Sequence, residues 1–252
     1  MGPAAAVPIK GVLIAHSRVS LVLALSLVGG SAAHADIWHA GDLTTYTQAS
    51  WGGDPSLPDP GAALLVASYD AVYSSTFGIV TVGSASGFTM SFTDTDSVRA
   101  YLPSIGTFSP LNGSSLNPIS TGSGGFGGEV LGLKFNVDFS DAGLLPGSSG
   151  LRFGDLLLEN FSAEPVFNGL TVRQFFGDLN VLLGGGSSAF KIADLGTTIQ
   201  DINASFGNGT PTAFAQEHLV APTSAGTVPE PSNWLPIFAV FGLGWTRRLR
   251  LG

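Results

Sequence analysis

The chain is rich in the two residues that interrupt regular secondary structure. It contains 35 glycines and 15 prolines among 252 residues, and only 11% of the residues are charged. Glycine and proline weaken helix interiors and favour turns. This composition predicts short strands joined by turns rather than long helices. The expected fold class is therefore mainly β, an antiparallel sheet or a sandwich.

The clearest strand pattern lies at residues 131–139, where every second side chain is apolar. This period of two is typical of a strand with one buried face and one solvated face. Further strands are expected at residues 63–68, 79–82, 88–92 and 153–161.

A change of pattern near the C-terminal end of the body predicts an αα-hairpin packed on the sheet. Thr171 and Gln174 have the spacing of a helix capping box. Apolar residues then recur at helical spacing until the glycines at 184–186, which end the helix. A second series with helical spacing runs from Ile192 to Phe206.

The N-terminal segment has the organisation of a secretory signal peptide. Basic residues precede an apolar run at residues 19–28, and Ala33 and Ala35 are small residues at the two positions that signal peptidase recognises. We therefore expect residues 1–35 to form a signal helix outside the folded domain, and signal peptidase to cleave after Ala35.

The C-terminal segment combines three features in a fixed order. Pro229, Glu230 and Pro231 come first, and the two prolines prevent a helix from continuing through them. An apolar run follows from Trp234 to Trp245. The chain then ends in a basic cluster that consists of Arg247, Arg248 and Arg250.

The apolar run predicts a short membrane helix. Twelve residues of helix span about 18 Å, which is less than the roughly 30 Å hydrocarbon core of a bilayer. Tryptophan favours the membrane interface and arginine extends to the headgroups. The basic end is then expected in the cytoplasm and the body outside, on a marginal anchor.

The tail at residues 228–252 resembles the PEP-CTERM sorting signal, although Pro236 departs from the Leu- and Gly-rich run usual in that family. The resemblance implies that an exosortase, a membrane-embedded cysteine protease or transpeptidase, recognises Pro229, Glu230 and Pro231. It would then release or transfer the body. The family occurs in Gram-negative bacteria that make exopolysaccharide, often in biofilms. The resemblance of the tail implies nothing about the fold of the body.

Between the two signals we expect a β-rich extracytoplasmic body at residues 36–206 and a Thr-, Ala-, Pro- and Gly-rich linker at residues 207–227. Residues 36–228 hold five basic and 17 acidic residues, a net charge of −12 (5 − 17). This charge disfavours nucleic-acid binding. Cysteine is absent, which excludes disulfides and thiolate metal sites.

Candidates for catalysis or metal binding are few. After signal cleavage the only histidines are His39 and His218, and the chain lacks the usual nucleophile, zinc and phosphate-binding motifs. No cofactor is expected. Acidic pairs offer oxygen ligands for Ca²⁺, but without a D-x-D-x-D-G loop we interpret them as turn residues. These pairs are Asp94 with Asp96, and Asp138 with Asp141.

Three functional hypotheses follow. The favoured one is a non-enzymatic surface or exopolysaccharide-matrix protein, first anchored by a single membrane pass and then placed at the cell surface or outside the cell. The second is a secreted glycan hydrolase that uses paired carboxylates. The third is a carbohydrate-binding module in which Trp38 and Trp51 stack on sugars, although burial in the core is the favoured interpretation of both rings.

Overall fold

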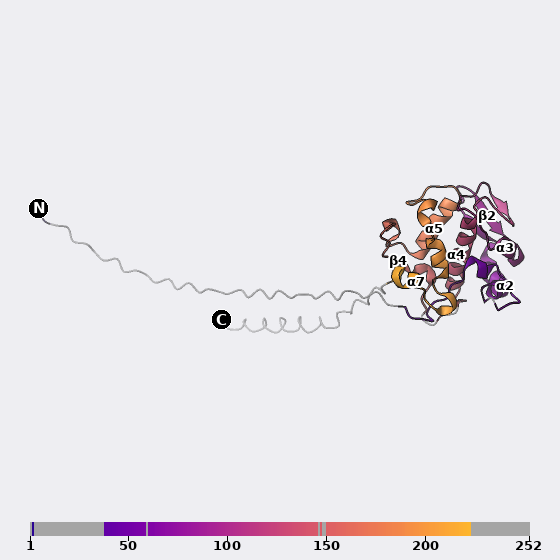
Figure 1. Ribbon diagram of the computed structural model, residues 1–252, viewed down its shortest axis with the longest axis horizontal. Helices are drawn as coiled ribbons and strands as arrows, with labels where there is room; N and C mark the ends of the chain where they lie inside the picture. The colour runs from indigo at the N-terminus through magenta and orange to yellow at the C-terminus, as the bar shows by residue number, and fades with distance from the viewer. Residues whose placement is uncertain (1, 3–37, 59, 146, 148–149, 223–252) are drawn as a thin grey trace, which may run out of the picture. The chain divides into compact units, whose positions relative to one another are not determined.

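Helices, not strands, are the main regular secondary structure of the body. The computed structural model describes Gly2 and residues 38–58, 60–145, 147 and 150–222, and this part of the chain contains seven α-helices and two small sheets (Figure 1). The expectation of a mainly β fold is therefore wrong.

Helix α4 (Gly125–Asp141) is the centre of the body. Thirteen of its 17 residues are buried. It contacts α1 (Gln48–Trp51), α5 (Val172–Leu183), α6 (Thr198–Ala204) and strand β1 (Val80–Gly83). Buried residues cover most of its circumference, and the side that bears Lys134, Asp138 and Asp141 is partly exposed.

The burial of α4 by its neighbours explains why the predicted strand at residues 131–139 is wrong. These residues form the second half of α4. The apolar alternate positions are buried, but so are Gly132 and Asn136 between them. When both sides of a helix are buried, an alternating pattern does not distinguish it from a strand.

Glycines allow neighbouring segments to approach α4 closely. A Cβ atom on Gly128 would collide with the side chain of Gln48, and one on Gly127 would collide with the hydroxyls of Ser123 and Tyr101. The glycine content therefore reflects close helix packing here as well as turns.

The strands expected at residues 79–82 and 88–92 are confirmed as the antiparallel pair β1 and β2 (Thr89–Phe92). Val80 lies opposite Phe92, and both side chains are buried. The two-residue strand β3 (Ser115–Leu116) extends this sheet by pairing in parallel with β2.

The strands expected at residues 63–68 and 153–161 are wrong. The first segment lies in α2 (Pro60–Val72). The second contains a 3₁₀ turn and only the two-residue strand β4 (Leu157–Leu158). Short apolar runs fit a buried helix as well as a strand, so the sequence of residues 63–68 does not separate the two.

The predicted helix after Thr171 is confirmed as α5. Thr171 Oγ1 accepts from the backbone N–H of Gln174 at 3.1 Å, and Gln174 Oε1 accepts from the backbone N–H of Thr171 at 2.8 Å. The second arm of the hairpin is a 3₁₀ turn (Ile192–Leu195) followed by the short helix α6.

The segment expected as a linker at residues 207–227 contributes to the body up to Pro222. Helix α7 (Ala213–His218) is followed by strand β5 (Leu219–Val220), which pairs antiparallel with β4. The remaining described elements are α3 (Thr95–Tyr101) and the 3₁₀ turns Ser74–Thr76, Phe153–Asp155, Pro165–Phe167 and Gly207–Gly209.

The two predicted sorting segments lie outside the described residues. This includes the cleavage residues Ala33 and Ala35, the motif residues 229–231 and the anchor residues 234–250. Among the residues that the structure describes, no helix has the length and apolar character needed to cross a membrane.

Candidate functional site

The core of the body contains a carboxyl group without a cationic partner. Glu129 of α4 is 5% exposed, and no Lys, Arg or His of the described residues forms an ion pair with it. Its Oε1 accepts a hydrogen bond from Gln48 Nε2 at 2.6 Å, and its Oε2 accepts one from Asn203 Nδ2 at 2.8 Å. Two helices, α1 and α6, thus supply an amide donor each.

The orientation of Gln48 is determined by a backbone group. Its Oε1 accepts from the N–H of Ser104 at 3.0 Å. Because an amide presents oxygen on one side and NH₂ on the other, the NH₂ group of Gln48 must face Glu129.

The orientation of Asn203 is determined in the same way, through a second amide. Asn136 Oδ1 accepts from the N–H of Tyr46 at 2.8 Å, and Asn136 Nδ2 donates to the carbonyl of Tyr46 at 2.8 Å. That Nδ2 also donates to Asn203 Oδ1 at 3.0 Å. The NH₂ of Asn203 is therefore directed at Glu129, and both carboxyl oxygens are acceptors.

Two opposing influences act on the charge of this carboxyl group. Burial raises the pKa of Glu129, whereas the hydrogen bonds from Asn203 and Gln48 lower it, and burial is the larger effect. Glu129 is not among the residues that line three hollows of the described surface. We interpret these side chains as a clamp that joins α1, α4 and α6 rather than as a reaction centre. The clamp consists of Gln48, Glu129, Asn136 and Asn203.

A second charged cluster lies near the surface, where α4 ends and α5 begins. Arg173 donates to both carboxylate oxygens of Asp141, at 2.7 and 2.8 Å, and to Asp155 at 3.1 Å. These bonds raise the pKa of Arg173. A retaining or inverting glycosidase needs substrate or water between its two carboxyl groups, whereas here a guanidinium group bridges them.

The first pair of aspartates considered for Ca²⁺ binds groups of the protein itself. Asp94 caps α3 by accepting from the N–H of Ser97 at 2.7 Å, and this bond lowers the pKa of Asp94. Asp96 lies 3.5 Å from Arg99. Asp94 thus has a local structural role, whereas the side chain of Asp96 is 91% exposed.

The second pair is also occupied by protein donors. Asp138 accepts from Lys134 Nζ at 2.8 Å and from the hydroxyl of Tyr73 at 2.8 Å, while Asp141 binds Arg173. The described residues contain no group of three or more His, Asp or Glu side chains arranged to hold a metal ion.

The two tryptophans considered for sugar stacking lie in the core, as the favoured interpretation predicted. Trp51 is fully buried and packs against Tyr46, Phe135 and Phe139. Trp38 is 8% exposed. Neither ring presents a face to solvent on which a sugar would stack.

The two histidines differ in their surroundings. The side chain of His39 is exposed and lies 3.7 Å from Asp42. His218 stacks on Phe161 with ring centroids 4.3 Å apart, and its Nδ1 lies 2.9 Å from the carbonyl oxygen of Glu159.

Two adjoining hollows on the described surface have volumes of about 460 and 410 Å³. They share Tyr46, Pro60 and Asn208; polar and apolar atoms line the larger hollow about equally, whereas apolar atoms form most of the lining of the smaller one. No paired carboxylates line either one.

Glu129 and its amide partners were not among the residues predicted from the sequence, although one signal was present. Glu129 is the only acidic residue between Asp96 and Asp138, and it lies in a run of glycine and apolar residues. An isolated carboxylate in such a run indicates burial, but its partners are far away in the sequence.

Comparisons with known proteins identify no relative of this chain. No protein-family model matches the chain, and neither a curated protein nor a solved structure shows significant similarity to it.

Proposed function

We propose that the protein is an exported cell-surface or exopolysaccharide-matrix protein that an exosortase processes at its C-terminal signal. The observation that carries this proposal is the order of the tail: Pro229-Glu230-Pro231, an apolar run and a terminal arginine cluster. A secretory signal at the other end of the chain supplies the route across the inner membrane.

The extent of the folded body is consistent with two processing events. The described body runs from Trp38 to Pro222, so it lies between Ala35 and Pro229. Cleavage at either predicted position would leave the described core contacts in place. A surface protein trimmed at both ends requires this separation between processing sites and core.

The arrangement of charged groups supports a structural or binding role for the body over hydrolysis. Glu129 is enclosed and holds helices together. Asp141 and Asp155 share Arg173. A glycan ligand would have to use a surface other than the tryptophan rings, because Trp38 and Trp51 are buried.

The proposal is tested by expressing the wild-type gene and a deletion of residues 229–231 in an exopolysaccharide-producing host with an exosortase. Intact mass and cell fraction are measured for both. A matched control deletes residues 224–226, which shortens the chain equally but keeps the motif.

We expect the wild type and the control to lose the tail and to reach the surface or the medium, while the deletion of the motif stays in the inner membrane. If all three proteins keep the tail and remain in the inner membrane, the motif does not direct sorting and the proposal fails.

A further inference from the structure

The first and last described segments of the body meet at one end of the molecule. Trp38 Nε1 donates to the carbonyl of Leu219 at 2.9 Å. The N–H of Glu159 donates to the carbonyl of His218 at 3.0 Å, and Asn160 Nδ2 donates to the carbonyl of Glu217 at 2.7 Å.

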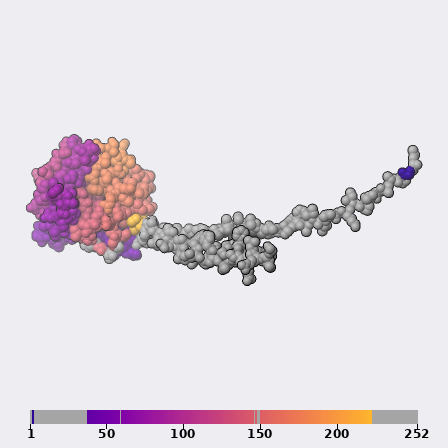
Figure 2. Space-filling model, turned by 180° about the vertical axis from the view of Figure 1, so that it is seen from behind, coloured from indigo at the N-terminus to yellow at the C-terminus, as the bar shows by residue number. Residues whose placement is uncertain are grey.

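We call this end the β4–β5 pole, and we define it by residues 38–39, 157–160 and 217–222. In Figure 1 the labels β4 and α7 lie on the side of the body away from β2. Figure 2 shows the yellow C-terminal residues at one edge of the body.

The chain between this pole and the sorting motif is short. Pro222 and Pro229 are separated by six residues, 223–228. Because a residue extends the chain by at most about 3.6 Å, these two prolines lie no more than roughly 25 Å apart. By the same count, a tether of the full 21 residues expected from the sequence would have allowed about 79 Å.

The pole itself has a polar surface. His39, Glu159, Asn160 and Glu217 are exposed there, and the stretch from residue 36 to 228 carries a net charge of −12 (5 − 17). Charged and amide side chains remain hydrated and do not enter the hydrocarbon region. An anionic membrane surface would repel such a body.

We infer that, in the membrane-anchored precursor, the β4–β5 pole faces the layer of phospholipid headgroups and is held there by the tether rather than by affinity for lipid. This inference rests on the proposed function, because the tail supplies the anchor. The chain from Pro222 to the start of the anchor at Trp234 spans at most about 43 Å, so the pole stays within that distance of the bilayer until cleavage at the motif frees the body.

The absence of cysteine allows a test with single labels. Glu217→Cys places a donor fluorophore at the pole, where the side chain is 69% exposed, and Leu116→Cys places one on β3, where the residue is 64% exposed. Each full-length precursor is reconstituted in phosphatidylcholine vesicles that contain an acceptor-labelled lipid, with the body outside.

We expect more efficient energy transfer from position 217 than from position 116. An insertion of about 20 Gly and Ser residues after Pro222, which adds roughly 25 Å of mean reach, should reduce the transfer from position 217. Equal transfer from the two positions, or transfer from position 217 that the insertion does not change, would overturn the inferred orientation.

A second measurement separates the tether from lipid affinity. A specific protease site is placed within the same insertion, and the vesicles are floated before and after cleavage. We expect the body to float with the vesicles only before cleavage. A body that still floats after cleavage overturns the tether mechanism, whereas a precursor that never floats overturns the proposed membrane anchor as well.

Discussion

The indole nitrogen of Trp38 donates a 2.9 Å hydrogen bond to the carbonyl oxygen of Leu219, 181 positions later in the chain. The ring of Trp38 also meets Phe206 edge-on, with centroids 5.0 Å apart. A residue near the start of the body thus fixes the position of its last strand.

Two substitutions of Trp38 should separate the contribution of the indole N–H to the free energy of unfolding from that of the indole ring. Trp38→Phe retains an apolar ring but removes the donor, so we expect a loss of about 0.5–1.5 kcal/mol in the free energy of unfolding. Trp38→Ala also removes the ring and should cost about 3–5 kcal/mol. Urea denaturation measures both values, and a Trp38→Phe protein as stable as the wild type would show that the hydrogen bond contributes nothing.

Two helical glycines should respond to alanine in opposite directions. Gly128→Ala inserts a methyl group into the side chain of Gln48, and we expect a loss of about 1–3 kcal/mol in the free energy of unfolding. Gly177→Ala in α5 meets no atom within 4 Å and should add about 0.5–1 kcal/mol, because alanine favours the helix. Thermal unfolding compares them, and the packing argument fails if the two changes have the same sign.

The buried carboxyl group of Glu129 should make stability depend on pH. Burial raises its folded-state pKa above the ordinary value of 4.5, so the folded protein binds the proton more tightly than the unfolded chain. Its stabilising contribution is therefore complete below the unfolded pKa and is lost as the pH rises through the folded pKa. Each unit of difference between the two pKa values corresponds to about 1.4 kcal/mol.

The comparison protein for this prediction is Glu129→Gln, which does not titrate at that position. The unfolding free energy of the wild type minus that of the variant should fall as the pH rises above the ordinary pKa of 4.5. A difference that rises with pH would mean that the amide donors outweigh burial.

The bridge between Arg173, Asp141 and Asp155 should have a small, salt-dependent effect, because all three side chains are partly exposed. Arg173→Lys removes the paired donor geometry and should cost about 0.5–1 kcal/mol at low salt. Gly154→Ala places a methyl group 2.6 Å from Arg173 Nη2 and should disturb the same contact. The double variant should then lose less than the sum of the single losses in urea denaturation; full additivity would contradict a shared contact.

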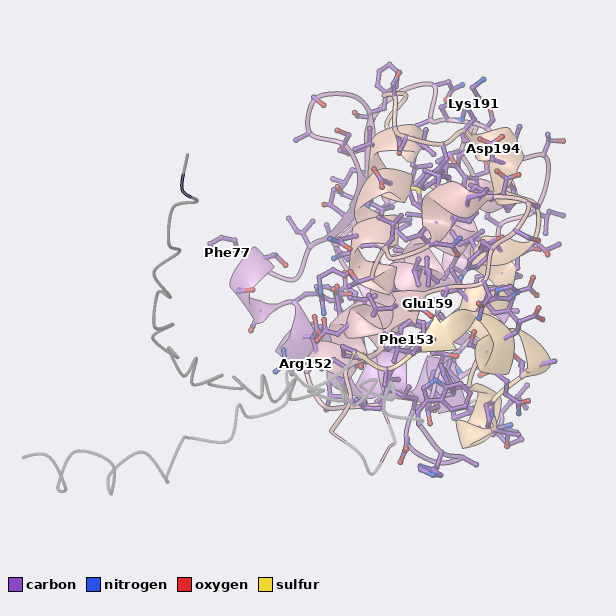
Figure 3. All side chains as sticks on the ribbon, turned by 90° about the vertical axis from the view of Figure 1, so that its left-hand side faces the viewer. Phe77, Arg152, Phe153, Glu159, Lys191 and Asp194 are labelled. Carbon is purple, nitrogen blue, oxygen red and sulfur yellow. The ribbon has the colours of Figure 1, made fainter. Side chains whose placement is uncertain are left out.

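An exposed aromatic residue carries local backbone strain. Phe77 has a φ of 57° and is 94% exposed, and its side chain extends away from the body (Figure 3). Asparagine tolerates the left-handed region better than phenylalanine, so Phe77→Asn should raise the unfolding free energy by roughly 0.5–1 kcal/mol. Ile119→Asn, which is also exposed but not in the left-handed region, is the control and should give no such gain.

The parts of the fold that the sequence predicts are those that depend on neighbours in the chain. The capping box of Thr171 and Gln174 joins residues three positions apart, and it begins α5 as expected. The alternating residues of β2 also form a strand as predicted. In both cases a local pattern and the final environment agree.

The parts that the sequence does not predict depend on distant contacts. Residues 131–139 have a strand-like pattern, but α1, α5 and α6 surround them and bury both sides of a helix. Glu129 meets Gln48 and Asn203, which are 81 and 74 positions away. No spacing rule connects such residues, so the clamp is evident only from the three-dimensional structure.

The central position of α4 also affects the order in which the body can form. Its partners include Tyr46, 90 positions before Asn136, and Asn203, 67 positions after it. Proteins dominated by such distant contacts fold slowly, because long loops must close before the contacts form. The body therefore cannot complete its core until the chain beyond residue 203 is available. In the export proposed above, the chain would cross the membrane before these distant contacts form.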